Sequence, residues 1–70
     1  MTRTEHMAWC KRRALEELDA GSEENAIASM ISDLRKHPET EASASPVLAM
    51  LGMEALGKQG AVRRWIEGFN

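Results

Sequence analysis

With 70 residues the chain can form one domain, and a domain of that size buries only about 60% of the surface that its unfolded chain exposes. Its 43% apolar and 29% charged residues exclude a chain that is disordered over most of its length. A net charge of −2 excludes a strong long-range attraction to nucleic acid or to an anionic membrane, and no run approaches the roughly 20 apolar residues of a membrane-spanning helix.

The first predicted helix has Thr4 as its N-cap and runs to about Ala20. Apolar side chains recur at helical spacing and predict one buried face, made of Met7, Cys10, Ala14, Leu15 and Leu18. Trp9 projects from the opposite side, beside Arg12 and Arg13. Either Trp9 packs over neighbouring side chains, which we favour because large aromatic residues are usually buried, or it is exposed at a protein interface with the two arginines. Trp9, Arg12 and Arg13 are therefore the candidate interface.

Cysteine and histidine usage bears on location and chemistry. Cys10 is the only cysteine, so no internal disulfide can form and a reducing cytoplasm is the expected location. The N-terminal segment lacks the apolar core of a secretory signal. His6 lies one helical turn before Cys10, but structural zinc needs four ligands and catalytic zinc typically three. Since a thiol on this helix also lacks an oxyanion hole, we expect no metal, no cofactor and no enzymatic activity.

Gly21 and Ser22 predict the turn between the first two helices. Gly21 can take the left-handed conformation that ends a helix, and Ser22 can cap the next one. The second helix then has one apolar face, with Asp33 on the outer side and Pro38 ending the run at His37. The residues predicted on that apolar face are Ala26, Ile27, Met30, Ile31 and Leu34.

The segment ALEELDAGSEENAIASMISDLRKHP resembles the turn and second helix of a tetratricopeptide repeat. It has glycine at the turn, an acidic pair after it, Ala26 and Ile27 in the small-then-large positions, and Pro38 where the closing proline of the repeat falls. The first helix departs from the pattern, because Arg13 and Glu17 fall where the repeat has large apolar residues. The resemblance therefore implies a helical hairpin, but not the ligand-contacting residues of true repeats.

A second resemblance covers most of the chain. The segments EHMAWCKRRALE, DLRKHPET and RRWIEGFN are similar to short bacteriophage-encoded proteins with no assigned activity. This resemblance implies a phage origin and brings no known chemistry.

The second half of the chain begins with a predicted polar loop from about residue 37 to residue 45, whose proline, acidic and hydroxyl residues offer nothing to bury. Ser45 and Pro46 then predict the start of a third helix, which runs to about Gly57. This helix is apolar on nearly every side, so it belongs in the centre of a bundle or in the seam of an oligomer. Gly52 within it predicts either the close approach of another helix, which we favour, or a locally weak helix.

A last short helix is predicted from Ala61 to Phe69, after a turn bracketed by Gly57 and Gly60. Its apolar face consists of Val62, Trp65, Ile66 and Phe69. The sequence thus predicts a small all-α bundle of three to four helices, built as a hairpin over about residues 4–37 and a second hairpin over about residues 45–69.

We expect this domain to work through contact with an unidentified protein partner, as an interaction or regulatory module acting on a host or phage protein. One alternative is a structural homodimer joined through the apolar third helix. Another is a weak nucleic-acid binder of the helix-turn-helix type, since Lys11 to Arg13 and Arg63 to Arg64 are basic clusters. Glu23 and Glu24 argue against the last alternative, because they stand where phosphate contacts would be made.

Overall fold

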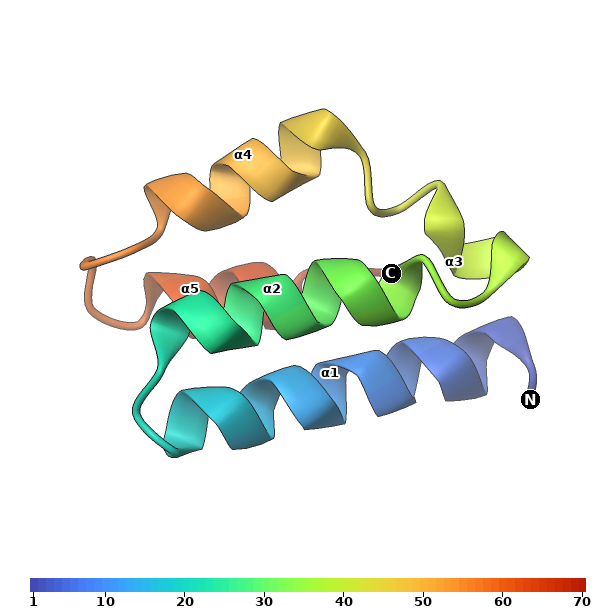
Figure 1. Cartoon of the computed structure of the whole chain (residues 1–70), viewed down its shortest axis with the longest axis horizontal. Helices are drawn as coiled ribbons and strands as arrows, with labels where there is room; N and C mark the ends of the chain where they lie inside the picture. The colour runs from blue at the N-terminus through green and yellow to red at the C-terminus, as the bar shows by residue number, and fades with distance from the viewer.

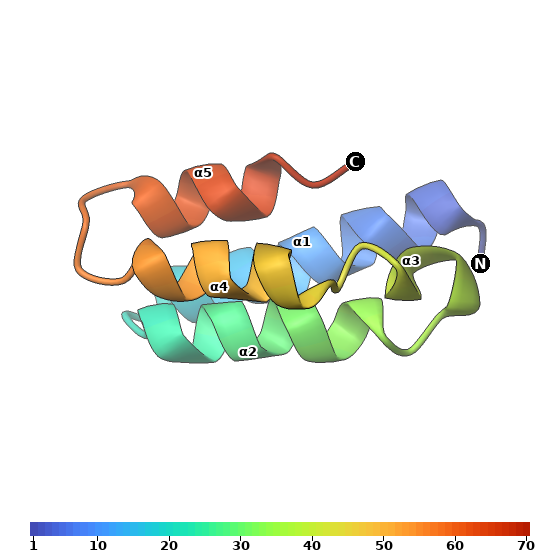
Figure 2. The ribbon, with the colours of Figure 1, turned by 90° about the horizontal axis from the view of Figure 1, so that it is seen from above.

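The computed structural model describes residues 1–70 and contains five α-helices and no β-strand, which confirms the predicted all-α fold. The helices are arranged in layers: α2 and α5 lie side by side in the middle, α1 lies on one side of them and α4 on the other (Figures 1 and 2). A short α3 closes one end of the bundle. In chain order the helices are α1 (Arg3–Asp19), α2 (Glu23–Leu34), α3 (Pro38–Glu41), α4 (Pro46–Glu54) and α5 (Ala61–Glu67).

Helix α1 begins two residues earlier than predicted. Its N-cap is Thr2 and not Thr4: the Thr2 side chain accepts a hydrogen bond from the backbone N–H of Glu5 at 3.1 Å, and the Glu5 carboxylate accepts one from the backbone N–H of Thr2 at 2.9 Å. This reciprocal pair needs a carboxylate or amide three residues after the cap, and Thr4 has Met7 there. The backbone and side-chain hydrogen bonds from Thr2 lower the pKa of Glu5 below its usual value.

The turn into α2 is the predicted one. Gly21 has a φ of 96°, and the Ser22 hydroxyl accepts a hydrogen bond from the backbone N–H of Asn25 at 3.2 Å. Helix α2 ends at Leu34, before the predicted end at His37, because the Thr40 hydroxyl donates a 2.6 Å hydrogen bond to the carbonyl of Leu34 and so replaces the next helical turn.

The stretch predicted as a polar loop contains α3. Pro38 is the first residue of this helix as well as a barrier to α2, and His37 caps it by accepting a hydrogen bond from the backbone N–H of Glu39 at 3.1 Å. The prediction that the stretch has nothing to bury is wrong, since Thr40 and Ala44 are buried. The polar composition of the stretch does not indicate this burial, because Thr40 is buried as a polar residue whose hydroxyl is hydrogen-bonded to α2.

The hydrophobic core fills the space between the layers. Small side chains on α1 and α2, including Cys10, Ala14 and Ala26, are fully buried and allow the two helices to lie close together. The predicted apolar faces of the first, second and last helices all contribute, although Leu15, Leu18 and Ile31 stay half-buried. The buried apolar residues are Met7, Cys10, Ala14, Ala26, Ile27, Met30, Leu34, Ala44, Ala55, Val62, Ile66 and Phe69.

Helix α4 is not in the centre of the bundle. Gly52 is its only buried residue, and the helix lies over α2 and α5 with most of its circumference open to water (Figure 2). A helix with apolar residues on every side has no single apolar face, so its sequence does not show which side packs against the rest of the protein. The predicted start at Ser45 and Pro46 is correct, and the Ser45 hydroxyl accepts a hydrogen bond from the backbone N–H of Leu48 at 3.2 Å.

The close approach predicted at Gly52 is confirmed, and its partner is Trp65 of α5. A β-carbon built on Gly52 would lie 2.7 Å from Cζ2 of the Trp65 indole. The indole N–H donates to the carbonyl of Leu48 at 2.9 Å, and the ring meets Phe69 edge-on at 5.0 Å between centroids. Trp65 therefore fills the gap between α4 and α5.

Candidate interaction surface

The structure brings Trp9 and Arg13 together in a cluster around Asp33. Trp9 is half-buried; its ring stacks on His6 at 5.3 Å between centroids, and the Arg13 guanidinium lies 4.8 Å from the indole centroid. The Lys36 ammonium lies 5.6 Å from the same centroid. Trp9 thus packs over neighbouring side chains. Arg12 is exposed and takes no part in these contacts, so the structure joins two of the three predicted interface residues, and their role as an interface stays a prediction.

Asp33, predicted on the outer side of its helix, is buried with 1% of its surface exposed. Arg13 donates to one carboxylate oxygen through Nε at 2.7 Å, and Lys36 donates to the other at 3.0 Å. Burial alone would raise the pKa of Asp33, but the hydrogen bonds from Lys36 and Arg13 outweigh it and hold that pKa below its usual value. The spacing of the sequence does indicate this burial: Asp33 follows Ala26 by seven residues, so the two side chains share one face of the helix.

The His6 and Cys10 pair does not form a reactive centre. Cys10 is fully buried, and burial raises the pKa of its thiol to about 11, so the thiol stays protonated at neutral pH. The Nε2 atom of His6 lies 2.8 Å from the backbone carbonyl oxygen of Asp33. No group of three or more His, Cys, Asp and Glu side chains is arranged to hold a metal ion.

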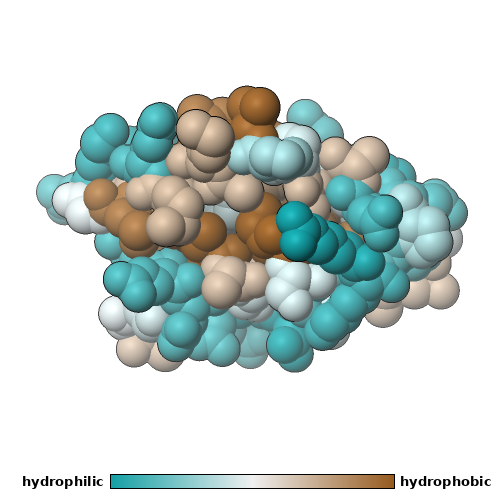
Figure 3. Space-filling view, turned by 45° about the horizontal axis from the view of Figure 1, so that its top comes forward, coloured by the Kyte–Doolittle hydropathy of each residue, from teal (hydrophilic) through white to brown (hydrophobic).

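The largest exposed apolar side chains of the helices gather on α4. We call this set the α4 ridge: Val47, Met50, Leu51 and Met53, with exposed fractions of 66%, 62%, 48% and 60%. Figure 3 brings this side of the molecule forward and shows apolar surface across the middle of the face with polar surface around it.

A groove between α2 and α4 adjoins the ridge. This α2–α4 groove has a volume of about 400 Å³, and six of its seven lining residues are apolar. Glu24 is the one charged residue and stands at the end where α2 begins. The hydrogen bond from the backbone N–H of Gly57 to the Glu23 carboxylate, at 3.0 Å, holds the end of α4 at this place. The apolar lining residues are Ile27, Ala28, Ile31, Ala49, Met53 and Leu56.

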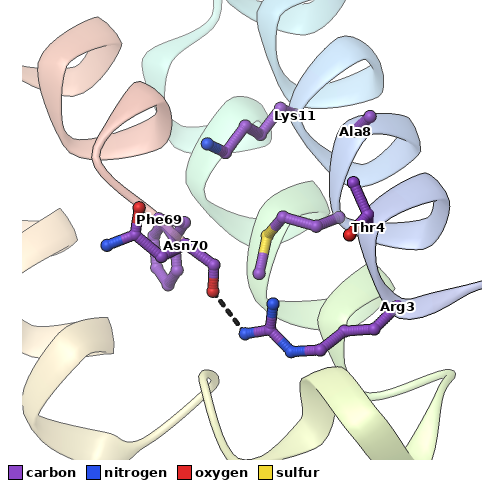
Figure 4. Close-up of a pocket in the computed structure, with 7 residues that line it drawn as sticks. Arg3, Thr4, Ala8, Lys11, Phe69 and Asn70 are labelled. Carbon is purple, nitrogen blue, oxygen red and sulfur yellow. Dashed lines mark hydrogen bonds between the residues drawn. The ribbon is translucent and has the colours of Figure 1, made fainter.

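A second cavity of about 400 Å³ lies beside the two ends of the chain (Figure 4). Its two cations already have partners: Arg3 donates to the backbone carbonyl oxygen of Asn70, and Lys11 donates to that of Glu67 at 3.1 Å. Met7 and Phe69 form its apolar part. These contacts attach the C-terminal end of the chain to α1, so we assign the polar groups of this cavity a structural role.

No protein-family model, curated protein or solved structure matches this chain. None of the helices is both long enough and apolar enough to cross a membrane. The surfaces described above are therefore the basis for a functional assignment, and the resemblances to a tetratricopeptide hairpin and to short phage proteins stay predictions.

Proposed function

We propose that this chain is a non-enzymatic protein-interaction module that binds its partner through the α4 ridge and the α2–α4 groove. The observation that carries the proposal is the exposure of Val47, Met50 and Met53, each at least 60% exposed on a helix with no charged residue before Glu54. Contiguous apolar patches are uncommon on the surfaces of monomeric proteins and mark sites of interaction.

The energetics support a partner that covers both features. Burying one Val, Leu or Met side chain completely is worth about 1.5–3 kcal/mol, so covering the four partly exposed ridge side chains would gain roughly 4–7 kcal/mol. Association itself costs about 4–15 kcal/mol. The ridge alone therefore falls short of a stable complex, and contacts in the groove must supply the rest.

The other surfaces support this function less well. Arg13 is already bound to Asp33 and Trp9 is half-buried, so the predicted interface on α1 has few free groups to offer. A helix-turn-helix contact with nucleic acid would present Glu23 and Glu24 to phosphate at the start of α2. The predicted action on a host or phage protein stays a prediction.

Site-specific photo-crosslinking tests the proposal. A photoreactive residue in place of Met50 should give protein adducts in an extract of the native host, whereas the same residue at exposed Glu16 on α1 should give none. Adding Val47→Gln and Met53→Gln should remove the adducts and change the free energy of unfolding by no more than about 0.5 kcal/mol, because both side chains are on the surface. Equal adducts at both positions, or none at position 50, would overturn the proposal.

A further inference from the structure

One line of side chains along α2, which starts in the groove, carries opposite charges at its two ends. Glu24, Ala28, Ile31 and Arg35 follow one another at intervals of four, three and four residues, so they form one line along the helix. Arg35 continues this line because it is the C-cap of α2 and keeps a right-handed helical conformation. At a rise of 1.5 Å per residue the two charged positions are roughly 16 Å apart. This line is thus acidic at Glu24, which lines the groove, apolar in the middle, and basic at Arg35, which lies beyond the groove lining.

Both end charges are available to a partner. The ion pairs of the protein are Arg13 and Lys36 with Asp33, and Arg63 with Asp19, so neither Glu24 nor Arg35 belongs to one. Both residues are exposed.

This pattern is complementary to itself. A two-fold rotation about an axis through the middle of this line exchanges its ends, so Glu24 of one copy would face Arg35 of the other, twice in the same interface. Two-fold interfaces use the same patch on both copies and need this kind of self-complementarity. Helix α4 runs antiparallel to α2, which places Met53 near the Glu24 end and Ala49 toward the other end (Figure 1). The rotation therefore also sets Met53 of one copy toward Ala49 of the other, which is a large side chain against a small one.

We propose that the occupant of the α4 ridge and the α2–α4 groove is a second copy of this chain, packed antiparallel about a two-fold axis with reciprocal pairs between Glu24 and Arg35. The proposal rests on the proposed function and names the partner. A standard interface buries about 800 Å² per copy, which is roughly a fifth of the 4363 Å² of surface on this chain. The dimer therefore needs the ridge and the groove together, and we expect it to be weak.

Sedimentation velocity of charge-reversed variants tests the arrangement. The full chain should dimerise between roughly 10 µM and 1 mM, the range expected of a small interface. Glu24→Arg alone and Arg35→Glu alone each set like charges together at two places, so each should dimerise at least about tenfold more weakly. Mixing the two variants should restore dimers, because every pair in the mixed dimer is then an opposite-charge pair. The double variant should also dimerise like the original chain.

Control variants separate this arrangement from others. Arg12→Glu reverses an exposed charge on α1 and should leave the dimer unchanged. Since Glu24→Arg places a cation in the first turn of α2, far-UV circular dichroism must show that each variant is folded. Glu24→Gln and Arg35→Gln, which remove a charge without reversing it, replace any variant that is not; each should weaken the dimer by a smaller factor, and weakening by neither would overturn the arrangement.

Each outcome decides between proposals. A chain that stays monomeric over the whole range overturns the second copy as occupant, and the proposed function survives only if position 50 still crosslinks to a different protein. A dimer that responds to Met53→Gln but not to the charge reversals overturns the antiparallel arrangement. A dimer lost in Arg12→Glu places the contact on α1 and overturns both proposals.

Discussion

Replacing Gly52 by alanine should destabilise the protein, although the same change usually stabilises a helix. Inside a helix, alanine is favoured over glycine by about 1 kcal/mol. At this site the new methyl group would lie 2.7 Å and 2.8 Å from two carbons of the Trp65 indole. The indole cannot move away freely, because it is held by the 2.9 Å hydrogen bond to the Leu48 carbonyl and by the edge-on contact with Phe69. The cost of overpacking is about 1–3 kcal/mol, so subtracting the helix gain of about 1 kcal/mol leaves a net loss of up to about 2 kcal/mol.

Urea unfolding followed by far-UV circular dichroism measures this loss. A chain of this length should have a free energy of unfolding of roughly 4–10 kcal/mol, so the change is a readily measured fraction. Trp65→Phe supplies the matched background, since the smaller ring leaves room for the methyl group. There Gly52→Ala should be neutral or stabilising, which gives a coupling energy of about 1 kcal/mol or more in the double-mutant cycle. A stabilising effect of Gly52→Ala in the original chain would refute the close contact between α4 and α5.

Three further predictions concern the core. Asp33→Asn should cost about 1–2 kcal/mol, less than the roughly 3–5 kcal/mol of a fully buried pair, because the Arg13 and Lys36 side chains are 48% and 55% exposed and can turn to water. Since the pKa of Asp33 is lower in the folded than in the unfolded chain, its contribution is present above the unfolded pKa and is lost as pH falls below about 4; an acid titration of stability that is identical in the variant would contradict this. Deleting residues 65–70 should abolish cooperative melting, and a truncated chain that melts like the original would show that these residues are dispensable. Cys10 should react with a thiol reagent much more slowly in the folded chain than in urea, because its side chain is fully buried and burial raises the pKa of its thiol to about 11; equal rates at neutral pH would disprove its burial.

The sequence predicted the fold correctly at positions where a residue type is strongly preferred for one role, such as ending or capping a helix. Gly21 with Ser22, and Ser45 with Pro46, fixed two helix starts because few other residues can end or cap a helix. The last helix was predicted from the spacing of its apolar residues, although it ends at Glu67 and not at Phe69. Phe69 is buried all the same, because hydrogen bonds from Arg3 and Lys11 hold this end of the chain against α1.

The features that the sequence did not predict depend on contacts between different helices. Asp33 is buried with Lys36 and Arg13 on its two carboxylate oxygens, and Arg13 lies on another helix, so no pattern within α2 contains it. Thr40 is buried for a similar reason, through its hydrogen bond to Leu34. The same holds for the candidate surface: the apolar pattern of α4 showed that the helix needs to be covered, but only the packing of Trp65 against Gly52 settles which sides remain open.

The small buried part of α4, whose only buried residue is Gly52, has a consequence for how the molecule opens. Most residues of α4 are exposed, while α1 and α2 hold most of the fully buried side chains. The segment from Pro46 to Glu54 should therefore detach in local fluctuations that leave the first hairpin intact, and its amide hydrogens should exchange with solvent at a lower opening free energy than those of α2. A partner that covers this segment would suppress this local opening, so its binding would slow amide exchange in the second half of the chain.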